Sequence, residues 1–362
     1  FKQYTHSIFF KRNSMSQTNT INAYAAMDTG SPLERFSYEV GELSADVVEI
    51  DVHYCGICHS DLSMIDNEWG MSQYPLVAGH EVIGTVAQTG RRVRGLEKGM
   101  TVGLGWHSGY CGQCASCKVG DQNLCAAAEG TIVARHGGFA DKVRAEASSV
   151  IAVPEGLDLE SAGPLFCGGI TVFNPLVQFD VKSTDKVAVI GIGGLGHIAL
   201  KFLNAWGCEV TAFTSSEPKR QEALQMGAHK TLNSRDPQEI EAAAGSFDFV
   251  ISTVNVKLDW DLYINTLKPR GRLHFVGATL EPLDLGVFSL LSGQRSVSGS
   301  PVGSPSTIAQ MLDFARLHDI RPQVEMFPME EINAALDHLR SGKARYRVVL
   351  SNRQAFAAEA GD

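Results

Sequence analysis

A glycine-rich turn between a buried strand and an amphipathic helix constrains the fold of this chain more than any other feature. The turn, 191–196, reads Gly-Ile-Gly-Gly-Leu-Gly and follows the apolar run 186–190. A helical pattern comes next, and then a second apolar run, 209–213. In this context glycine permits a tight turn and lets backbone N–H groups approach a pyrophosphate at the positive end of the helix. We therefore expect a dinucleotide to be bound at Gly191, Gly193, Gly194, Leu195 and Gly196.

The end of the second apolar run distinguishes the two common dinucleotides. A site for NAD places Asp or Glu there, because a carboxylate binds the ribose 2′-hydroxyl. This chain instead continues with Thr214, Ser215 and Ser216, followed by Lys219 and Arg220. Hydroxyl groups and cations suit a 2′-phosphate, although the two cations are equally read as solvated charges at a helix start. NADP is the expected cofactor, with NAD as the alternative.

The pattern along the chain predicts two kinds of structure. Residues 20–165 read mostly as short strands and glycine-rich loops, whereas strands and helices alternate after Gly168. Such alternation predicts a parallel sheet covered by helices on both faces. Beyond residue 300, we expect a helix opened by Ser304 and a closing strand at 346–350.

Length and charge exclude several classes of protein. A chain of 362 residues, 44% of them apolar, is too long for a small stapled module and too apolar for a disordered one. The net charge of −9 provides no basic footprint for nucleic acid or anionic lipid, so we expect neither as a partner. The apolar run in residues 1–19 is too short for a secretory signal, so we expect these residues to form a flexible extension. A transit peptide is the alternative. The expected location is cytoplasmic.

Four of the eight cysteines are spaced C-x2-C-x2-C-x7-C in a glycine-rich loop, 109–130, that has too few apolar residues for its own core. This spacing is typical of a tetrahedral zinc site that organises a loop. An iron–sulfur cluster is the competing hypothesis, but a ferredoxin run ends C-x3-C-P, whereas the last gap here is seven with no proline after it. We expect a structural zinc site formed by Cys111, Cys114, Cys117 and Cys125.

A second set of potential ligands is divided among three motifs, at 58–61, 80–81 and 167. Two thiolates and one imidazole form a ligand set of catalytic zinc that leaves the fourth position open. Each residue taken alone is more often a buried thiol or a core histidine. Together with the other two motifs, they favour a catalytic zinc site at Cys58, His80 and Cys167, with Glu81 approaching the metal from behind.

These motifs closely resemble the zinc-dependent medium-chain alcohol dehydrogenase family, particularly its cinnamyl alcohol dehydrogenase-like branch. The likeness covers about residues 20–352 and rests on segments 55–61, 79–84, 111–125, 168–173, 191–196 and 214–216. The resemblance implies an α/β protein in which a GroES-like, β-rich catalytic domain has an inserted Rossmann domain with a doubly wound parallel sheet. The implied bounds are 20–167 and 303–362 for the catalytic domain and 168–302 for the Rossmann domain, with the active site in the cleft between them.

The resemblance also implies roles for individual residues. Ser60 would bind the substrate oxygen and relay its proton, and Asp61 would orient His80. Many relatives carry a terminal proton-accepting His where this chain has Ser63, which leaves the outer proton route open. Residues expected near the nicotinamide are Thr171, Val276, Ser298, Gly299 and Ser300, and the expected pocket walls are Trp69, Trp106 and Pro301. Ordinary packing is the alternative for the pocket walls.

The implied activity is hydride transfer between NADP(H) and a primary alcohol or aldehyde, aromatic or medium-length and apolar, with two Zn²⁺ per chain. The expected direction is aldehyde reduction, and the expected assembly is a homodimer or homotetramer. The alternatives are an NAD-preferring alcohol dehydrogenase and a zinc-free NADPH quinone or enone reductase on the same fold. The intact zinc-ligand set argues against the second alternative. A non-enzymatic redox module has no support beyond the cysteines themselves.

Overall fold

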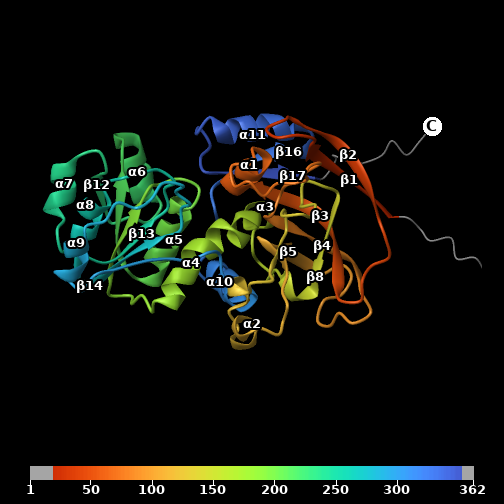
Figure 1. The fold of residues 1–362 in the computed structure, drawn as a ribbon, viewed down its shortest axis with the longest axis horizontal. Helices are drawn as coiled ribbons and strands as arrows, with labels where there is room; N and C mark the ends of the chain where they lie inside the picture. Colours follow the sequence, from red (N-terminus) through yellow and green to blue (C-terminus); the bar gives the residue numbers. More distant parts are fainter. Residues whose placement is uncertain (1–18, 353–362) are drawn as a thin grey trace, which may run out of the picture.

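Two lobes, each built on its own β-sheet, make up the molecule (Figure 1). The computed structural model describes residues 19–352. The extension expected at residues 1–19 falls outside this range except for Asn19, where the first strand begins. Within the described range, no helix is long and apolar enough to span a bilayer.

The sheet of one lobe combines strands from both ends of the described chain. Its order is β16-β17-β3-β4-β5-β9, and β8 also pairs with β3. Strand β17 lies antiparallel to β3, with Val348 opposite Ile57, so the closing strand is held beside the segment that precedes Cys58. The strands are β3 (Val47–Ile57), β4 (Val82–Thr89), β5 (Thr101–Leu104), β8 (Lys142–Glu146), β9 (Val150–Ala152), β16 (Val324–Pro328) and β17 (Arg347–Ser351).

The sheet of the other lobe is parallel throughout and has the order β12-β11-β10-β13-β14-β15. Numbered along the chain, this is the order 3-2-1-4-5-6 of a doubly wound dinucleotide-binding sheet. Successive side chains of β10 point to opposite faces: Val187 and Val189 pack in the core that contains α4 and α5, whereas Ala188 and Ile190 face α8. The strands are β10 (Lys186–Ile190), β11 (Glu209–Thr214), β12 (Lys230–Asn233), β13 (Phe247–Ser252), β14 (Leu267–Phe275) and β15 (Ser296–Gly299).

Helices α4 and α5 lie where the lobes meet. One buried cluster joins Tyr54 and Ile83 of the first sheet to Val187 of the second, so the lobes share a packed core. The helices are α1 (His59–Ile65), α2 (Ala115–Val119), α3 (Leu159–Ala162), α4 (Gly168–Gln178), α5 (Gly196–Trp206), α6 (Glu217–Gln225), α7 (Pro237–Ala242), α8 (Trp260–Asn265), α9 (Val287–Leu291), α10 (Pro305–Leu317) and α11 (Ile332–Arg340).

Short elements complete the fold. The hairpin of β1 (Asn19–Ala26) and β2 (Leu33–Val40) and the pair of β6 (His107–Gly109) and β7 (Glu129–Gly130) form two further sheets. The 3₁₀ turns are η1 (Gln122–Leu124), η2 (Ala147–Ser149), η3 (Gly163–Phe166) and η4 (Met329–Glu331). The helix expected after Ser304 is α10, and the Ser304 side chain caps it by accepting a hydrogen bond from the Thr307 N–H.

Candidate active site and metal centres

Four buried potential ligands from three separate segments meet between the lobes. Cys58 caps the start of α1, His80 and Glu81 lie directly before β4, and Cys167 lies at the start of α4. One ligand atom from each residue lies within 4.8 Å of all the others. His80 Nε2 is 3.3 Å from Cys167 Sγ, which is 3.8 Å from Cys58 Sγ. The structure therefore brings together all four residues that the sequence places in one site.

Asp61 organises this cluster from behind. Its buried carboxylate accepts hydrogen bonds from the backbone N–H groups of Cys58 and Gly79, both at 2.8 Å, and from His80 Nδ1 at 2.9 Å. With Nδ1 bonded to the carboxylate, Nε2 is directed at the two thiols. Burial is the largest single effect and opposes a charge on His80, but the charges and hydrogen bonds of Asp61 and Cys58 together outweigh it and raise the pKa of His80 well above its ordinary value. The structure has this contact where the resemblance implies it, and the role of Asp61 in catalysis stays a proposal.

The side chains of Cys58 and Cys167 are hydrogen-bonded to each other. The Cys167 thiol donates to Cys58, and this hydrogen bond lowers the pKa of Cys58 well below its ordinary value. A nearby thiolate and imidazole are soft and borderline ligands that suit Zn²⁺, and a bound dication would take the place of the protons that these groups otherwise hold. The ligand chemistry of the cluster therefore fits zinc.

Glu81 pairs with a residue that the sequence analysis missed. Arg347 of β17 donates to Glu81 Oε1, and both side chains are buried. The other oxygen, Oε2, is buried and has no hydrogen-bond partner among residues 19–352. A Cβ built on Gly194 would lie 3.0 Å from Arg347 Nη1, so the guanidinium also lies against the glycine-rich turn. The sequence indicates the role of Arg347 only weakly, because Arg347 is simply the one charged residue in the closing strand expected at 346–350.

Two serines of α1 differ in their surroundings. Ser60 Oγ lies 3.7 Å from Cys58 Sγ, beside the ligand cluster. Ser63, which stands where many relatives carry a proton-accepting His, donates instead to Glu68 Oε2 at 2.6 Å. The Ser60 hydroxyl therefore lies at the ligand cluster, whereas the Ser63 hydroxyl is bonded to an exposed carboxylate.

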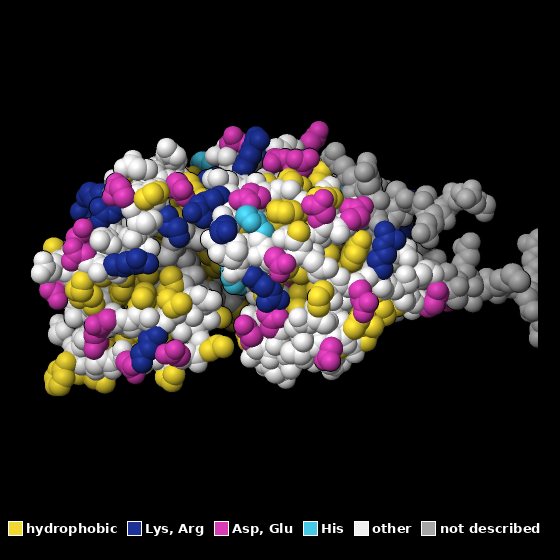
Figure 2. All heavy atoms as spheres, turned by 90° about the horizontal axis from the view of Figure 1, so that it is seen from above, with side chains coloured by type: hydrophobic (Ala, Val, Ile, Leu, Met, Phe, Trp, Pro, Cys, Tyr) yellow, Lys and Arg dark blue, Asp and Glu magenta, His cyan; other side chains and the backbone are white. Residues whose placement is uncertain are grey.

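Of the three expected pocket walls, two lie near the cluster. The Trp106 ring is edge-on to His80, with 5.1 Å between centroids, and Trp69 contacts Trp106 at 6.0 Å. Pro301 is exposed. Figure 2 shows a hollow between the two lobes, and charges of both signs are interspersed on the face around it.

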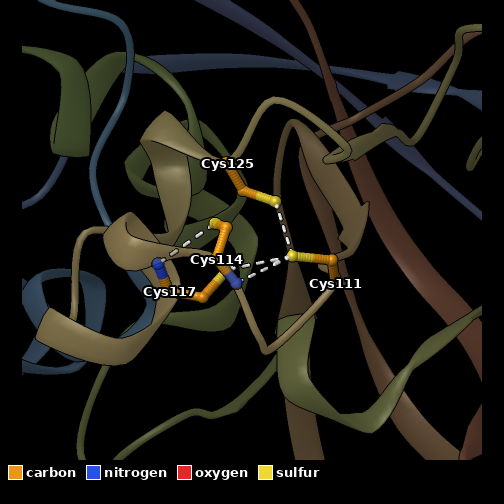
Figure 3. Close-up of side chains that lie close together, drawn as sticks. All are labelled: Cys111, Cys114, Cys117 and Cys125. Atoms are coloured by element: carbon orange, nitrogen blue, oxygen red, sulfur yellow. Dashed lines mark hydrogen bonds between the residues drawn. The ribbon is translucent and has the colours of Figure 1, made fainter.

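The four cysteines of the segment 109–130, which are Cys111, Cys114, Cys117 and Cys125, converge around the short helix α2 (Figure 3). Their sulfur atoms all lie within 4.8 Å of one another, with 3.5 Å between Cys125 Sγ and Cys111 Sγ. Cys114 caps α2, and its sulfur accepts a hydrogen bond from the Cys117 N–H. Nearby Val119 and Leu124 are 73% and 54% exposed, so the segment 109–130 has little apolar core of its own. A closed set of four thiols fits a structural zinc.

The glycine-rich turn has room for a ligand backbone. Gly191 has a φ of +86°, which favours glycine, and a Cβ on Gly196 would lie 1.9 Å from the Gly191 carbonyl oxygen. A Cβ on Gly193 would meet no heavy atom within 4 Å. Thr253 Oγ1 donates to the Gly191 carbonyl at 2.7 Å and holds the turn. The helix begins at Gly196 with Leu195 as its cap, so the positive end of this helix lies at the turn. This cradle fits a pyrophosphate.

The residues expected at the ribose phosphate lie at the end of β11 and the start of α6. Thr214 Oγ1 is buried and has no hydrogen-bond partner among residues 19–352, and Ser215 and Ser216 follow it. Lys219 makes no ion pair in the same range, but Arg220 is held by Glu239, with contacts of 2.8 and 3.1 Å. Of these two cations, only Lys219 has no ion pair among residues 19–352 and is free to bind a phosphate.

The residues expected at the nicotinamide come from three elements. The Thr171 N–H donates to the Cys167 carbonyl in α4, and the Val276 N–H donates to the Ser252 carbonyl at 3.0 Å. The Ser298 and Ser300 hydroxyls, on either side of Gly299, contact the two ring nitrogens of buried His274 at 2.9 and 3.0 Å. The sequence analysis missed His274, because a single histidine within the run 272–278 gives only a weak indication of a functional residue.

Comparison with known proteins explains this arrangement. Residues 44–155 match the alcohol dehydrogenase GroES-like domain, and residues 194–316 match the zinc-binding dehydrogenase family. The aldehyde reductase AdhA of Synechocystis sp. is 64% identical over 332 residues, which cover 92% of this chain and 99% of that protein. The chain belongs to the zinc-dependent medium-chain alcohol dehydrogenase family. This alcohol dehydrogenase is also 40% identical over 338 residues to cinnamyl alcohol dehydrogenase 2 of Rauvolfia serpentina, covering 90% of this chain and 93% of that one.

Solved structures agree with the assignment. The cinnamyl alcohol dehydrogenase SbCAD4 of Sorghum bicolor superposes with a TM-score of 0.88 at 37% identity, covering 92% of this chain and 98% of that one. The enzyme CAD of Helicobacter pylori, complexed with NADP(H), gives 0.87 at 30% identity, covering 94% and 100%. The expected fold, a GroES-like domain with a Rossmann-type parallel sheet, is confirmed, as is the activity class, an alcohol dehydrogenase or aldehyde reductase acting on small molecules.

Proposed function

We propose that this alcohol dehydrogenase uses zinc and NADP(H) to reduce aldehydes that are aromatic or medium-length and apolar. The observation that carries the proposal is the buried cluster of Cys58, His80, Glu81 and Cys167, set where the two sheets meet. The domain division at residues 168 and 302, the cytoplasmic location and the individual site roles stay predictions. Oxidation of NADPH measured across a panel of aliphatic and aromatic aldehydes tests the proposal. Activity on enones alone, without bound metal, would overturn it.

The chain's own groups account for positioning and proton transfer in this proposal. When bound, zinc would supply a Lewis acid for a carbonyl or hydroxyl oxygen, and NADPH would supply the hydride. Asp61 holds His80 so that Nε2 faces the thiols, and Arg347 neutralises Glu81 at the rear of the cluster. Ser60 Oγ, beside Cys58, would give a proton to the substrate oxygen during aldehyde reduction and take it back during alcohol oxidation. Trp106 shields the cluster on one side.

Replacing Ser60 with alanine is expected to lower turnover by about 10²-fold, because it removes the hydroxyl that lies 3.7 Å from Cys58 Sγ and would exchange the proton. Zinc content and the affinity for NADPH should stay unchanged. Ser60→Thr is the matched control, since it keeps a hydroxyl at the same carbon and should retain most of the turnover. Steady-state kinetics with metal analysis measures both; wild-type turnover in Ser60→Ala would remove this residue from the proton route.

The preference for NADP rests on Thr214, Ser215, Ser216 and Lys219, and it agrees with the NADP(H) complex of the Helicobacter pylori relative. Lys219→Ala is expected to raise the KM for NADPH by about tenfold, the effect of one charge-assisted hydrogen bond, and to leave the KM for NADH unchanged. Lys230→Ala is the control, because Lys230 pairs with Glu209 at the opposite end of β11. Equal kinetics with both dinucleotides in the wild type would contradict the preference.

A homodimer or homotetramer is supported by an unpaired sheet edge beside exposed apolar side chains. Strand β15 ends the parallel sheet, and α9 nearby carries Val287, Phe288 and Leu291, which are 64%, 84% and 65% exposed. Figure 2 shows hydrophobic side chains gathered on this lobe. Exposed apolar groups and an open strand edge favour pairing with another chain. Light scattering of the purified protein measures the assembly.

A further inference from the structure

His197 is buried beside the glycine-rich turn, and the proposed mechanism gives it no part. It is the second residue of α5, and its side chain is wholly inaccessible to solvent. Its Nδ1 lies 3.0 Å from the Gly193 carbonyl oxygen, and its Nε2 lies 3.1 Å from the backbone nitrogen of Gln323. The imidazole therefore spans the gap between the turn and the segment that leads into β16.

The protonation of this imidazole follows from its partners. The Gln323 N–H is a donor, so Nε2 accepts, and the ring proton lies on Nδ1 and is donated to Gly193. Burial lowers the pKa of His197 to about 3, so the ring is neutral near pH 7. Both hydrogen bonds thus persist together.

The face of the His197 ring contacts a second segment. It stacks on Tyr346, with 4.9 Å between centroids and 16° between planes. The backbone N–H groups of Tyr346 and Arg347 both donate to the Gln323 carbonyl, at 3.1 and 3.0 Å. The Tyr346 hydroxyl donates to Glu222 of α6, and Arg347 reaches Glu81 in the ligand cluster. A short chain of contacts thus runs from the glycine-rich turn through His197 to the ligand cluster.

We propose that His197 is a positioning residue, which sets the place of the glycine-rich turn relative to the ligand cluster through Gln323 and Arg347. The inference rests on the proposed function, because a dinucleotide held by the turn must place its hydride donor within about 3–3.5 Å of the substrate carbon. The Gly193 bond shapes the turn that holds the dinucleotide, whereas the Gln323 bond fixes the turn against the other lobe. Loss of the first bond should affect binding, and loss of the second should affect the chemical step.

Two amide variants of His197 test its hydrogen bonds to Gly193 and to Gln323 one at a time. His197→Asn keeps an N–H at the place of Nδ1 but has no atom that reaches Gln323, whereas His197→Gln places an acceptor at Nε2 and removes the donor to Gly193. For Asn we expect a Kd for NADPH within about threefold of wild type and kcat lowered about tenfold, the effect of one buried hydrogen bond. For Gln we expect the reverse: Kd raised about tenfold and kcat within about threefold. The Asn variant should also show a larger primary isotope effect on kcat with deuterated NADPH.

Calorimetric titration with NADPH, saturating kinetics, zinc analysis and thermal melting are measured on the full chain. His229→Asn is the control, because this exposed imidazole bonds Val210 at the far end of β11 and should change neither Kd nor kcat. The inference is overturned if both amide variants match wild type, or if Kd and kcat worsen equally in both. If the wild type reduces no aldehyde, the proposed function fails, but the Kd comparison still tests the Gly193 bond.

Discussion

Replacing Cys167 with alanine is expected to lower turnover by about 10⁴-fold or more and to remove about one zinc ion per chain. Cys167 lies 3.3 Å from His80 Nε2 and 3.8 Å from Cys58 Sγ, so its loss leaves two of the three nitrogen and sulfur ligands. Glu81 is a hard oxygen donor with one of its oxygens held by Arg347, so it is a poor substitute for the lost thiolate. Zinc analysis of the purified variant and steady-state kinetics with the best aldehyde of the panel measure the two effects.

Cys55→Ala is the matched control for this variant. Cys55 is equally buried and lies in β3 only three residues before Cys58, but its sulfur is outside the ligand cluster. The control should keep both zinc ions and its turnover, with a loss of about 1–3 kcal/mol in the free energy of unfolding from the small cavity. Full zinc content and wild-type turnover in Cys167→Ala would show that this cluster is not the catalytic metal site.

Cys114→Ala is expected to remove the other zinc ion and to unfold the segment 109–130. Cys114 supplies a sulfur to the four-cysteine set and also caps α2, and the exposed Val119 and Leu124 provide no core that would replace the metal. The melting temperature should fall by about 10 °C, since structural zinc contributes directly to folding. Trypsin should cleave after Lys118, which lies on α2, much faster than in the wild type.

Ser116→Ala tests whether the effect belongs to the metal site. Ser116 lies on the same short helix but offers no metal ligand, so its zinc content, melting temperature and cleavage rate should match wild type. Mass spectrometry of the tryptic fragments locates the cut. A Cys114→Ala protein that keeps about two zinc ions and resists trypsin would contradict the structural site.

Local sequence patterns predicted the features whose parts lie close together in the chain. The four cysteines fall within 15 residues, and the glycine-rich turn within six, so their spacing already implies their geometry. The alternation of strands and helices likewise predicted the parallel sheet, but it did not fix where a strand ends, such as β13 at Ser252 and β14 at Phe275. Runs of apolar residues report burial, whereas strand ends depend on the pairing partners.

The catalytic ligand set was predicted because each member lies in a recognisable motif. The fate of Arg220 was not predicted, since its partner Glu239 lies on the next helix and competes with any ligand phosphate. His274 was also missed, because a single polar residue inside an apolar strand has no periodic signal.

By itself, the sequence determined the glycine-rich turn, the two sets of candidate metal ligands and the class of enzyme, because short spacings and familiar motifs encode them. Only the tertiary structure decided what joins these parts. Arg347 meets Glu81 across 266 residues, and Gln323 meets His197 across 126. Contacts of that separation depend on β17 lying beside β3 and on the shared core of the two lobes, and no local pattern of side chains records either.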